Sequence, residues 1–266
     1  MTLVIGLCGK DGCLLAADTK INVTKKSSGT LHGEPLHDVR YTTNCSKIFV
    51  SDKHGIMIGW AGLNVRELAA AKLKERCDSV EAFSDDNDEL EKTIRAACED
   101  ACTTPSNINQ PQFDGQLLVV NPRSRFRPLW SARFYRYLIP SKAGGPLEGQ
   151  FSCTPRAVFN KEVIGEDANS ALFFLERYYA PKVFSLDELL LLAGHVIRSA
   201  SYLAKDWISG IEIAICTETG SPEFIQIETL NEIWRKSESL SADIGHKLRE
   251  PLSDIRRGKS RALLGE

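Results

Sequence analysis

The stretch that decides the fold covers residues 2–20 and reads TLVIGLCGKDGCLLAADTK. Residues 3–7 and residues 13–17 are both apolar and are each long enough for a β-strand. Between them stands Asp11-Gly12, a dipeptide typical of tight hairpin turns. Both strands are apolar at nearly every residue rather than at alternate residues, which predicts a sheet covered on both of its faces.

Further along the chain, apolar strands of the same kind are followed by amphipathic helices. Strands are expected at residues 47–50, 56–60, 116–120, 128–134, 157–164, 211–216 and 224–227. Helices are expected at residues 65–73, 90–102, 167–179 and 185–200, and a long polar loop at residues 20–44. This order predicts an α+β fold: a four-layer αββα sandwich, in which two antiparallel sheets pack face to face and helices cover both outer faces.

The end of the chain has a different composition. From residue 237 to residue 266 it is polar and weakly amphipathic, Pro251 interrupts it, and basic residues gather at 256–261. We interpret this basic cluster as a solvated surface rather than a nucleic-acid site. The sequence therefore predicts one domain over residues 1–236 and a polar helical extension over residues 237–266.

Composition and charge exclude several classes of protein. Lys and Arg number 33 against 35 Asp and Glu, so no overall field attracts nucleic acid. No apolar run approaches the ~20 residues of a membrane span, and residues 1–7 lack the basic region of a signal peptide. The eight cysteines are scattered without a C-x-x-C pair, which favours reduced thiols. We expect a cytoplasmic protein with no metal, cofactor, nucleic-acid or membrane partner.

Thr2 is the candidate nucleophile. Its small side chain permits removal of Met1, and that removal would make Thr2 the N-terminal residue. A terminal threonine carries a hydroxyl nucleophile together with an α-amine whose ordinary pKa is about 7.7, so that the amine can act as the base.

Several segments downstream of Thr2 suggest a family. They are Asp18 at the end of the opening hairpin, SKIFV at 46–50, IGWAGL at 58–63, Leu175-Glu176, and KDWISG at 205–210 followed by IEIAI at 211–215. With them the chain resembles the proteasome β-subunit family of N-terminal nucleophile hydrolases, from Thr2 to about residue 236. The resemblance implies the N-terminal nucleophile hydrolase fold and a threonine-type peptidase that acts on peptides or unfolded proteins within a homo-oligomeric ring. It leaves an ATPase or other regulatory partner unknown.

The resemblance also implies roles for individual residues. Lys47 would hold a cation beside the Thr2 hydroxyl, with Asp18 as its counter-ion, and the Gly62 N–H would donate to the oxyanion. Asp206 and Ser209 would hold the α-amine in place. Each residue has a structural alternative, since Asp18 could cap a turn, Lys47 could reach solvent from a strand end, and Asp206 could end a helix.

By the same resemblance, the pocket for the residue before the cleaved bond would be formed by four side chains: Ile21, Cys45, Trp60 and Asn64. Trp60 would make this pocket shallow and favour small side chains. The alternative is that Trp60 lies in the core between the sheets.

Three features depart from the family's pattern. The loop over residues 23–41 is longer, the loop after Ser209 is shorter, and Gly165-Glu166-Asp167 stands where the family has Gly-Ser-Gly. If Glu166 faces the site, its charge raises the pKa of the amine; if it lies at a helix N-terminus, it stabilises the helix. Two alternatives to a peptidase therefore stay open: a catalytically inactive structural subunit, and an amidase for small amides.

Overall fold

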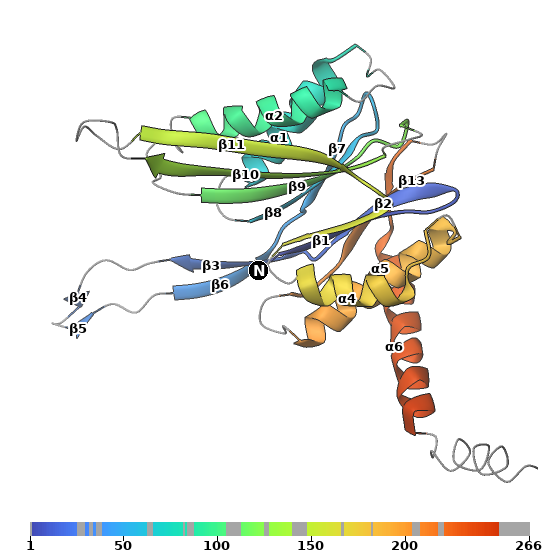
Figure 1. Ribbon diagram of the computed structural model, residues 1–266. Helices are drawn as coiled ribbons and strands as arrows, with labels where there is room; N and C mark the ends of the chain where they lie inside the picture. The colour runs from blue at the N-terminus through green and yellow to red at the C-terminus, as the bar shows by residue number, and fades with distance from the viewer. Residues whose placement is uncertain are drawn as a thin grey trace, which may run out of the picture.

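The computed structural model describes residues 2–25, 30–31, 34–35, 39–62, 66–81, 83, 88–104, 113–124, 128–139, 148–165, 168–181, 183–203, 208–217 and 221–249. Within these residues two five-stranded antiparallel sheets pack against each other, and helices cover their outer faces (Figure 1). The predicted α+β sandwich of four layers is confirmed.

The opening hairpin forms the centre of the first sheet. This sheet has the order β12 (Lys161–Gly165), β1 (Leu3–Cys8), β2 (Gly12–Ala17), β13 (Glu212–Thr217) and β14 (Glu223–Phe224). The second sheet has the order β11 (Glu148–Val158), β10 (Leu129–Ile139), β9 (Phe113–Val120), β8 (Met57–Gly62) and β7 (Ile48–Val50).

Every residue of β1 and β2 is buried, because each face of the first sheet packs against a different layer. Leu3, Ile5 and Leu7 belong to the core shared with the helices. Val4 belongs to the core between the two sheets, where Gly6 also leaves room for Leu118 of β9. These two cores explain why the strand is apolar at consecutive positions.

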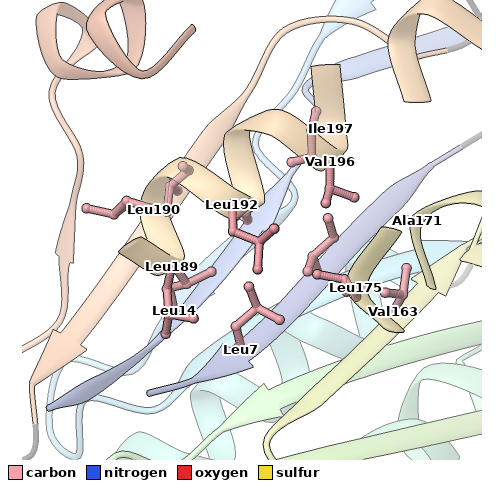
Figure 2. Close-up of a cluster of buried hydrophobic side chains, with 14 of the residues drawn as sticks. Leu7, Leu14, Val163, Ala171, Leu175, Leu189, Leu190, Leu192, Val196 and Ile197 are labelled. Carbon is pink, nitrogen blue, oxygen red and sulfur yellow. The ribbon is translucent and has the colours of Figure 1, made fainter. Parts of the chain in front are cut away.

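Helices complete the two outer layers. The first sheet is covered by α4 (Ala168–Tyr178) and α5 (Leu186–Leu203), and α6 (Ile227–Arg249) packs on α5. Figure 2 shows Leu7 and Leu14 in one apolar cluster with Leu189 of α5 and Leu175 of α4. The second sheet is covered by α1 (Arg66–Ser79) and α2 (Asp88–Thr103).

Three predicted elements were wrong. The strand expected at 224–227 ends at Phe224 as part of β14, and helix α6 begins at Ile227. The single strand expected at 157–164 is the end of β11 and most of β12, which lie in different sheets. Asn160 joins them at a φ of 59°, a left-handed conformation that asparagine tolerates better than most residues.

The loop expected at 20–44 contains strands. β3 (Lys20–Lys25) pairs with β6 (Val39–Asn44), and β4 (Thr30–Leu31) pairs with β5 (Glu34–Pro35). Figure 1 shows β3 and β6 extending away from the two sheets. The β-branched residues in KINVTK and VRYTTN favour strands, although both segments are polar overall.

Helix α6 crosses the position where the composition changes. It continues from Ile227 to Arg249, whereas the predicted domain boundary lies between residues 236 and 237. The division into a domain at 1–236 and an extension at 237–266 stays a prediction. Among the helices described, none combines the length and the apolar character needed to cross a membrane.

Candidate functional site

The centre of the candidate site is a buried ion pair. Lys47 Nζ lies 2.8 Å from Asp18 Oδ2, and both side chains are 0% exposed. Asp18 directly follows β2 and Lys47 directly precedes β7, so the pair joins the first sheet to the second. Lys47 Nζ also donates to the backbone carbonyl of Lys20 at 2.8 Å. Such a pair needs good geometry and further hydrogen bonds to offset the loss of hydration.

Asp18 links this ion pair to the beginning of β1. Its Oδ1 accepts a hydrogen bond from the Leu3 amide at 2.7 Å, and its own amide donates to the Leu3 carbonyl at 3.1 Å. Leu3 follows Thr2, which is only 4% exposed. Burial raises the pKa of the Asp18 carboxyl, while the charge and hydrogen bond of Lys47 and the Leu3 amide act in the opposite direction.

The backbone of Thr2 lies against Gly165. Leu3 pairs with Gly165 in the register of β1 and β12, and Gly165 has a φ of 119°. A Cβ at this position would overlap the carbonyl oxygen of Thr2, so only glycine allows the approach. The Gly165 amide donates to Gln116 Oε1 at 2.8 Å. Glu166 and Asp167, whose orientation was left open, lie outside the described residues.

Gly62 ends β8 in a conformation that requires glycine. Its φ is 112°, and a Cβ would lie 2.9 Å from the Cα of Gly115 on the neighbouring strand. The register pairs Gly62 with Gly115, so two glycines bring the strands β8 and β9 together there. Its predicted function as an oxyanion donor stays a prediction.

Ser209 lies next to the segment that carries Asp18. Its backbone carbonyl accepts a hydrogen bond from the Thr19 amide at 3.2 Å. Gly210 follows at a φ of 69°, and a Cβ there would overlap the Thr19 hydroxyl. Asp206, the other residue expected to hold the amine, lies outside the described part of the chain.

The four expected pocket residues are only partly described. Trp60 is fully buried in the core between the second sheet and helices α1 and α2, rather than in the core between the sheets. Cys45 is half-buried and lines a pocket of about 580 Å³. Asn64 and the side chain of Ile21 lie outside the description. Their grouping into a substrate pocket stays a prediction.

Sequence reasoning missed Glu212 on β13. Its Oε2 accepts a hydrogen bond from the Ser46 hydroxyl at 2.8 Å, and its Oε1 accepts one from the backbone amide of Lys47. Glu212 also lines the 580 Å³ pocket, together with Thr19, Asn44 and other residues of these segments. A single acidic residue in the otherwise apolar stretch IEIAI was the signal that could have identified it.

This arrangement can do one kind of chemistry with the groups that it contains. A fixed ammonium and its carboxylate lie next to the beginning of β1, and the hydroxyl-bearing residue Thr2 directly precedes this strand. A cation in that position stabilises an alkoxide or an oxyanion. In the described residues no group of three or more His, Cys, Asp or Glu side chains is arranged to hold a metal ion.

Comparison with known proteins gives a fold and no family. No protein-family model matches the chain, and a search of curated proteins finds no match. Among solved structures, the chain is similar to the Anbu (Gly-1) mutant from Hyphomicrobium sp. strain MC1. The TM-score is 0.57 at 13% sequence identity, and the match covers 94% of this chain and 100% of the other.

These findings correct the predicted membership in the proteasome β-subunit family. The Anbu structure is one of many solved structures that match the chain, and 13% identity shows a shared fold alone. The segments that suggested the β-subunits are short, and short similar segments do not single out one family among proteins that share a fold. The fold itself is a proteasome-like N-terminal nucleophile hydrolase fold.

Proposed function

We propose that this protein is a threonine-type peptidase that cleaves amide bonds with Thr2 as its N-terminal nucleophile. One observation carries the proposal: the fully buried Lys47–Asp18 pair is hydrogen-bonded through Asp18 to the amide of Leu3, the residue that follows Thr2. A buried charge pair is costly, and a hydrophobic pair of similar size would often be as stable. Its place beside the beginning of β1 therefore favours a function in the reaction.

In this proposal the reaction begins after Met1 is removed. The Thr2 hydroxyl oxygen bonds to the carbonyl carbon of the substrate, its proton passes to the Thr2 α-amine, and the carbonyl electron pair moves to oxygen. The Gly62 amide donates to this oxyanion, and the Lys47 ammonium stabilises the developing charge. The C–N bond then breaks, and the protonated amine gives its proton to the leaving nitrogen. Water hydrolyses the resulting ester with the same amine as base.

The proposed setting is the cytoplasm, and the proposed substrates are peptides or unfolded proteins. The eight cysteines all lie in the described residues and form no disulfide there, which agrees with a reducing compartment. We propose that copies of the chain assemble into a homo-oligomeric ring, since large apolar side chains such as Phe173 and Leu203 are exposed. Light scattering on the purified protein tests this assembly, because a monomeric mass would contradict it.

The decisive experiment detects the reactive N-terminus. Intact-mass measurement of the purified full-length chain shows whether Met1 is absent, and incubation with a peptide epoxyketone shows whether both the hydroxyl and the amine of Thr2 react. We expect a single adduct in the wild type and in the conservative variant Thr2→Ser. We expect none in Thr2→Ala, because the nucleophilic oxygen is absent.

The results separate the peptidase from its two alternatives. Retained Met1, or no adduct in the wild type alongside the Thr2→Ala control, would contradict the proposal and favour a structural subunit. The same adduct in Thr2→Ala would show that another group reacts and would contradict Thr2 as the nucleophile. An adduct without turnover of any peptide in a mixed peptide library would favour an amidase that acts on small amides.

A further inference from the structure

Glu212 holds the backbone from which the Lys47 side chain extends. We propose that Glu212 is a positioning residue for the reaction at Thr2: its carboxylate fixes the backbone of Ser46 and Lys47 and thereby the place of the Lys47 ammonium. This inference rests on the proposed function and extends it by a residue that acts through Lys47.

Lys47 needs such a partner because of its place in the second sheet. It stands just before β7, which lies at the edge of the described sheet and pairs there with β8. Its carbonyl accepts a hydrogen bond from the Trp60 amide at 3.1 Å. A buried backbone amide needs an acceptor, and the Lys47 N–H finds one in the Glu212 carboxylate.

Glu212 supplies this acceptor from the other sheet. It stands at the beginning of β13 in the first sheet, and its Oε1 accepts the hydrogen bond of the Lys47 amide. Its Oε2 accepts a hydrogen bond from the Ser46 hydroxyl at 2.8 Å. One carboxylate therefore holds two consecutive residues, and hydrogen bonds to an ionised acceptor are roughly twice as strong as those between neutral groups.

These bonds fix both ends of Lys47. The backbone is held by Glu212 and Trp60, and the ammonium is held by Asp18 and the carbonyl of Lys20. A lysine has a long flexible side chain, so a fixed origin is needed to keep its nitrogen at one point. Catalytic groups lose much of their effect when they shift by about 1 Å, and the cost can reach about 10²-fold.

The charges of Glu212 and Lys47 support the same positioning of Lys47 as the hydrogen bonds do. Burial raises the pKa of the Glu212 carboxyl, while its hydrogen bonds and the charge of Lys47 oppose this change. The charge of Lys47 thus favours the ionised form of Glu212, which is the form that accepts the two hydrogen bonds most strongly.

A purely structural function makes a different prediction. In that case Glu212 would only join β13 to the edge of the second sheet, and its replacement would lower stability without changing the reactivity of the molecules that remain folded. Reaction with a peptide epoxyketone separates the two, because the maximal inactivation rate constant reports positioning and the inhibition constant reports binding.

The test compares Glu212→Ala with Glu212→Gln and with a matched control, Glu223→Gln, in the full-length chain. Glu223 is exposed on the neighbouring strand β14. We expect Glu212→Ala to lower the maximal inactivation rate constant about tenfold or more, with the inhibition constant within about twofold of the wild type. Glu212→Gln keeps an oxygen acceptor for the Lys47 amide and should recover most of the rate. Glu223→Gln should react as the wild type does.

Several outcomes would overturn the inference or the proposal beneath it. A folded Glu212→Ala variant that reacts at the wild-type rate overturns the inference alone and leaves the threonine peptidase intact. A wild-type chain that forms no adduct contradicts the proposed function itself. If Glu212→Ala does not fold, Glu212→Asp takes its place: it keeps the charge but is one methylene too short, and a wild-type rate in this variant overturns the inference.

Discussion

Two clusters of buried polar side chains in this molecule differ in where their partners come from. The Thr2-side cluster consists of Asp18, Lys47 and Glu212. The α5–α6 cluster consists of His195 and Arg198 on α5 and Ser237 on α6. Each of the two clusters contains a fully or almost fully buried cation, since Lys47 is 0% and Arg198 is 2% exposed.

Among the described residues, the hydrogen-bond and ion-pair partners of Arg198 lie on these two helices, and His195 also has a ring contact with Phe174 of α4. Arg198 donates to the Trp234 carbonyl at 2.6 Å and to the Tyr202 hydroxyl at 2.7 Å, and it pairs with Glu238. His195 Nδ1 lies 3.0 Å from the Ser237 hydroxyl. Helix packing alone accounts for these contacts, because they fasten α6 onto α5.

The partners of the Thr2-side cluster come from separate parts of the chain. Asp18 follows β2, Lys47 precedes β7, Glu212 opens β13, and the Leu3 amide belongs to β1. Burial of a charge therefore does not identify a site in this fold. What distinguishes the Thr2-side cluster is that separate strands of both sheets bring charges to the place where the chain begins.

Replacement of Lys47 should have the largest effect. In Lys47→Met we expect the reaction of Thr2 with a peptide epoxyketone to slow by about 10²–10³-fold, because the stabilising cation is lost. Asp18 also loses its partner, so the free energy of unfolding should fall by about 3–5 kcal/mol. Inactivation kinetics and urea unfolding measure the two effects separately.

A second variant separates stability from reactivity at this position. The double variant Lys47→Met with Asp18→Asn removes the unpaired carboxylate, and we expect it to regain part of the lost stability but none of the lost reactivity. A Lys47→Met protein that reacts at the wild-type rate would contradict the difference between the two clusters.

Replacement of Arg198 tests the other cluster and should affect stability alone. In Arg198→Met we expect the free energy of unfolding to fall by about 1–3 kcal/mol, because the hydrogen bonds from the buried guanidinium to the Trp234 carbonyl and the Tyr202 hydroxyl are lost. Glu238 is 58% exposed and is left in water, so it adds little to this loss. The epoxyketone reaction should proceed at the wild-type rate at temperatures well below unfolding. A slower reaction of the folded variant would contradict the expectation that the α5–α6 cluster affects stability alone.

The layers of the fold could be predicted from the sequence because the pattern of apolar residues indicates which faces of each strand are buried. A strand that is apolar at consecutive positions needs a cover on both faces, and β1 has one. The turn at Asn160 could not be predicted in this way. The expected strand at 157–164 passed over the polar residues 160–162, which can also occur within a strand, and the packing of β11 and β12 in different sheets reveals the break.

The site was predictable only in part. Asp18 and Lys47 stand at strand ends, and their pairing follows once β2 and β7 are brought together. Glu212 lies in the first sheet and accepts hydrogen bonds from residues that precede a strand of the second sheet. This contact depends on how the two sheets pack, which no short stretch of sequence predicts. The family was predicted wrongly, because short segments around such a site can be similar in proteins that share only the fold.

The smallest expected effect concerns His195 and the pH dependence of stability. Burial lowers the pKa of His195 below its ordinary value of 6.5. The unfolded chain then binds a proton more readily than the folded chain, so His195 contributes stability above pH 6.5 that is lost as the pH falls below this value. The loss cannot exceed about 1.4 kcal/mol for each pH unit.

Replacement of His195 by glutamine should remove this part of the pH dependence. Between pH 7.5 and pH 5.5, urea unfolding should show a smaller loss of stability in His195→Gln than in the wild type, because glutamine does not titrate in this range. Taking the difference between the two proteins cancels the other groups that titrate. If both proteins lose equal stability, the histidine is not held in its neutral form by burial. The epoxyketone reaction of the variant should follow the wild-type pH profile throughout, since the described contacts of His195 are with Phe174 of α4 and Ser237 of α6 rather than with the residues beside Thr2.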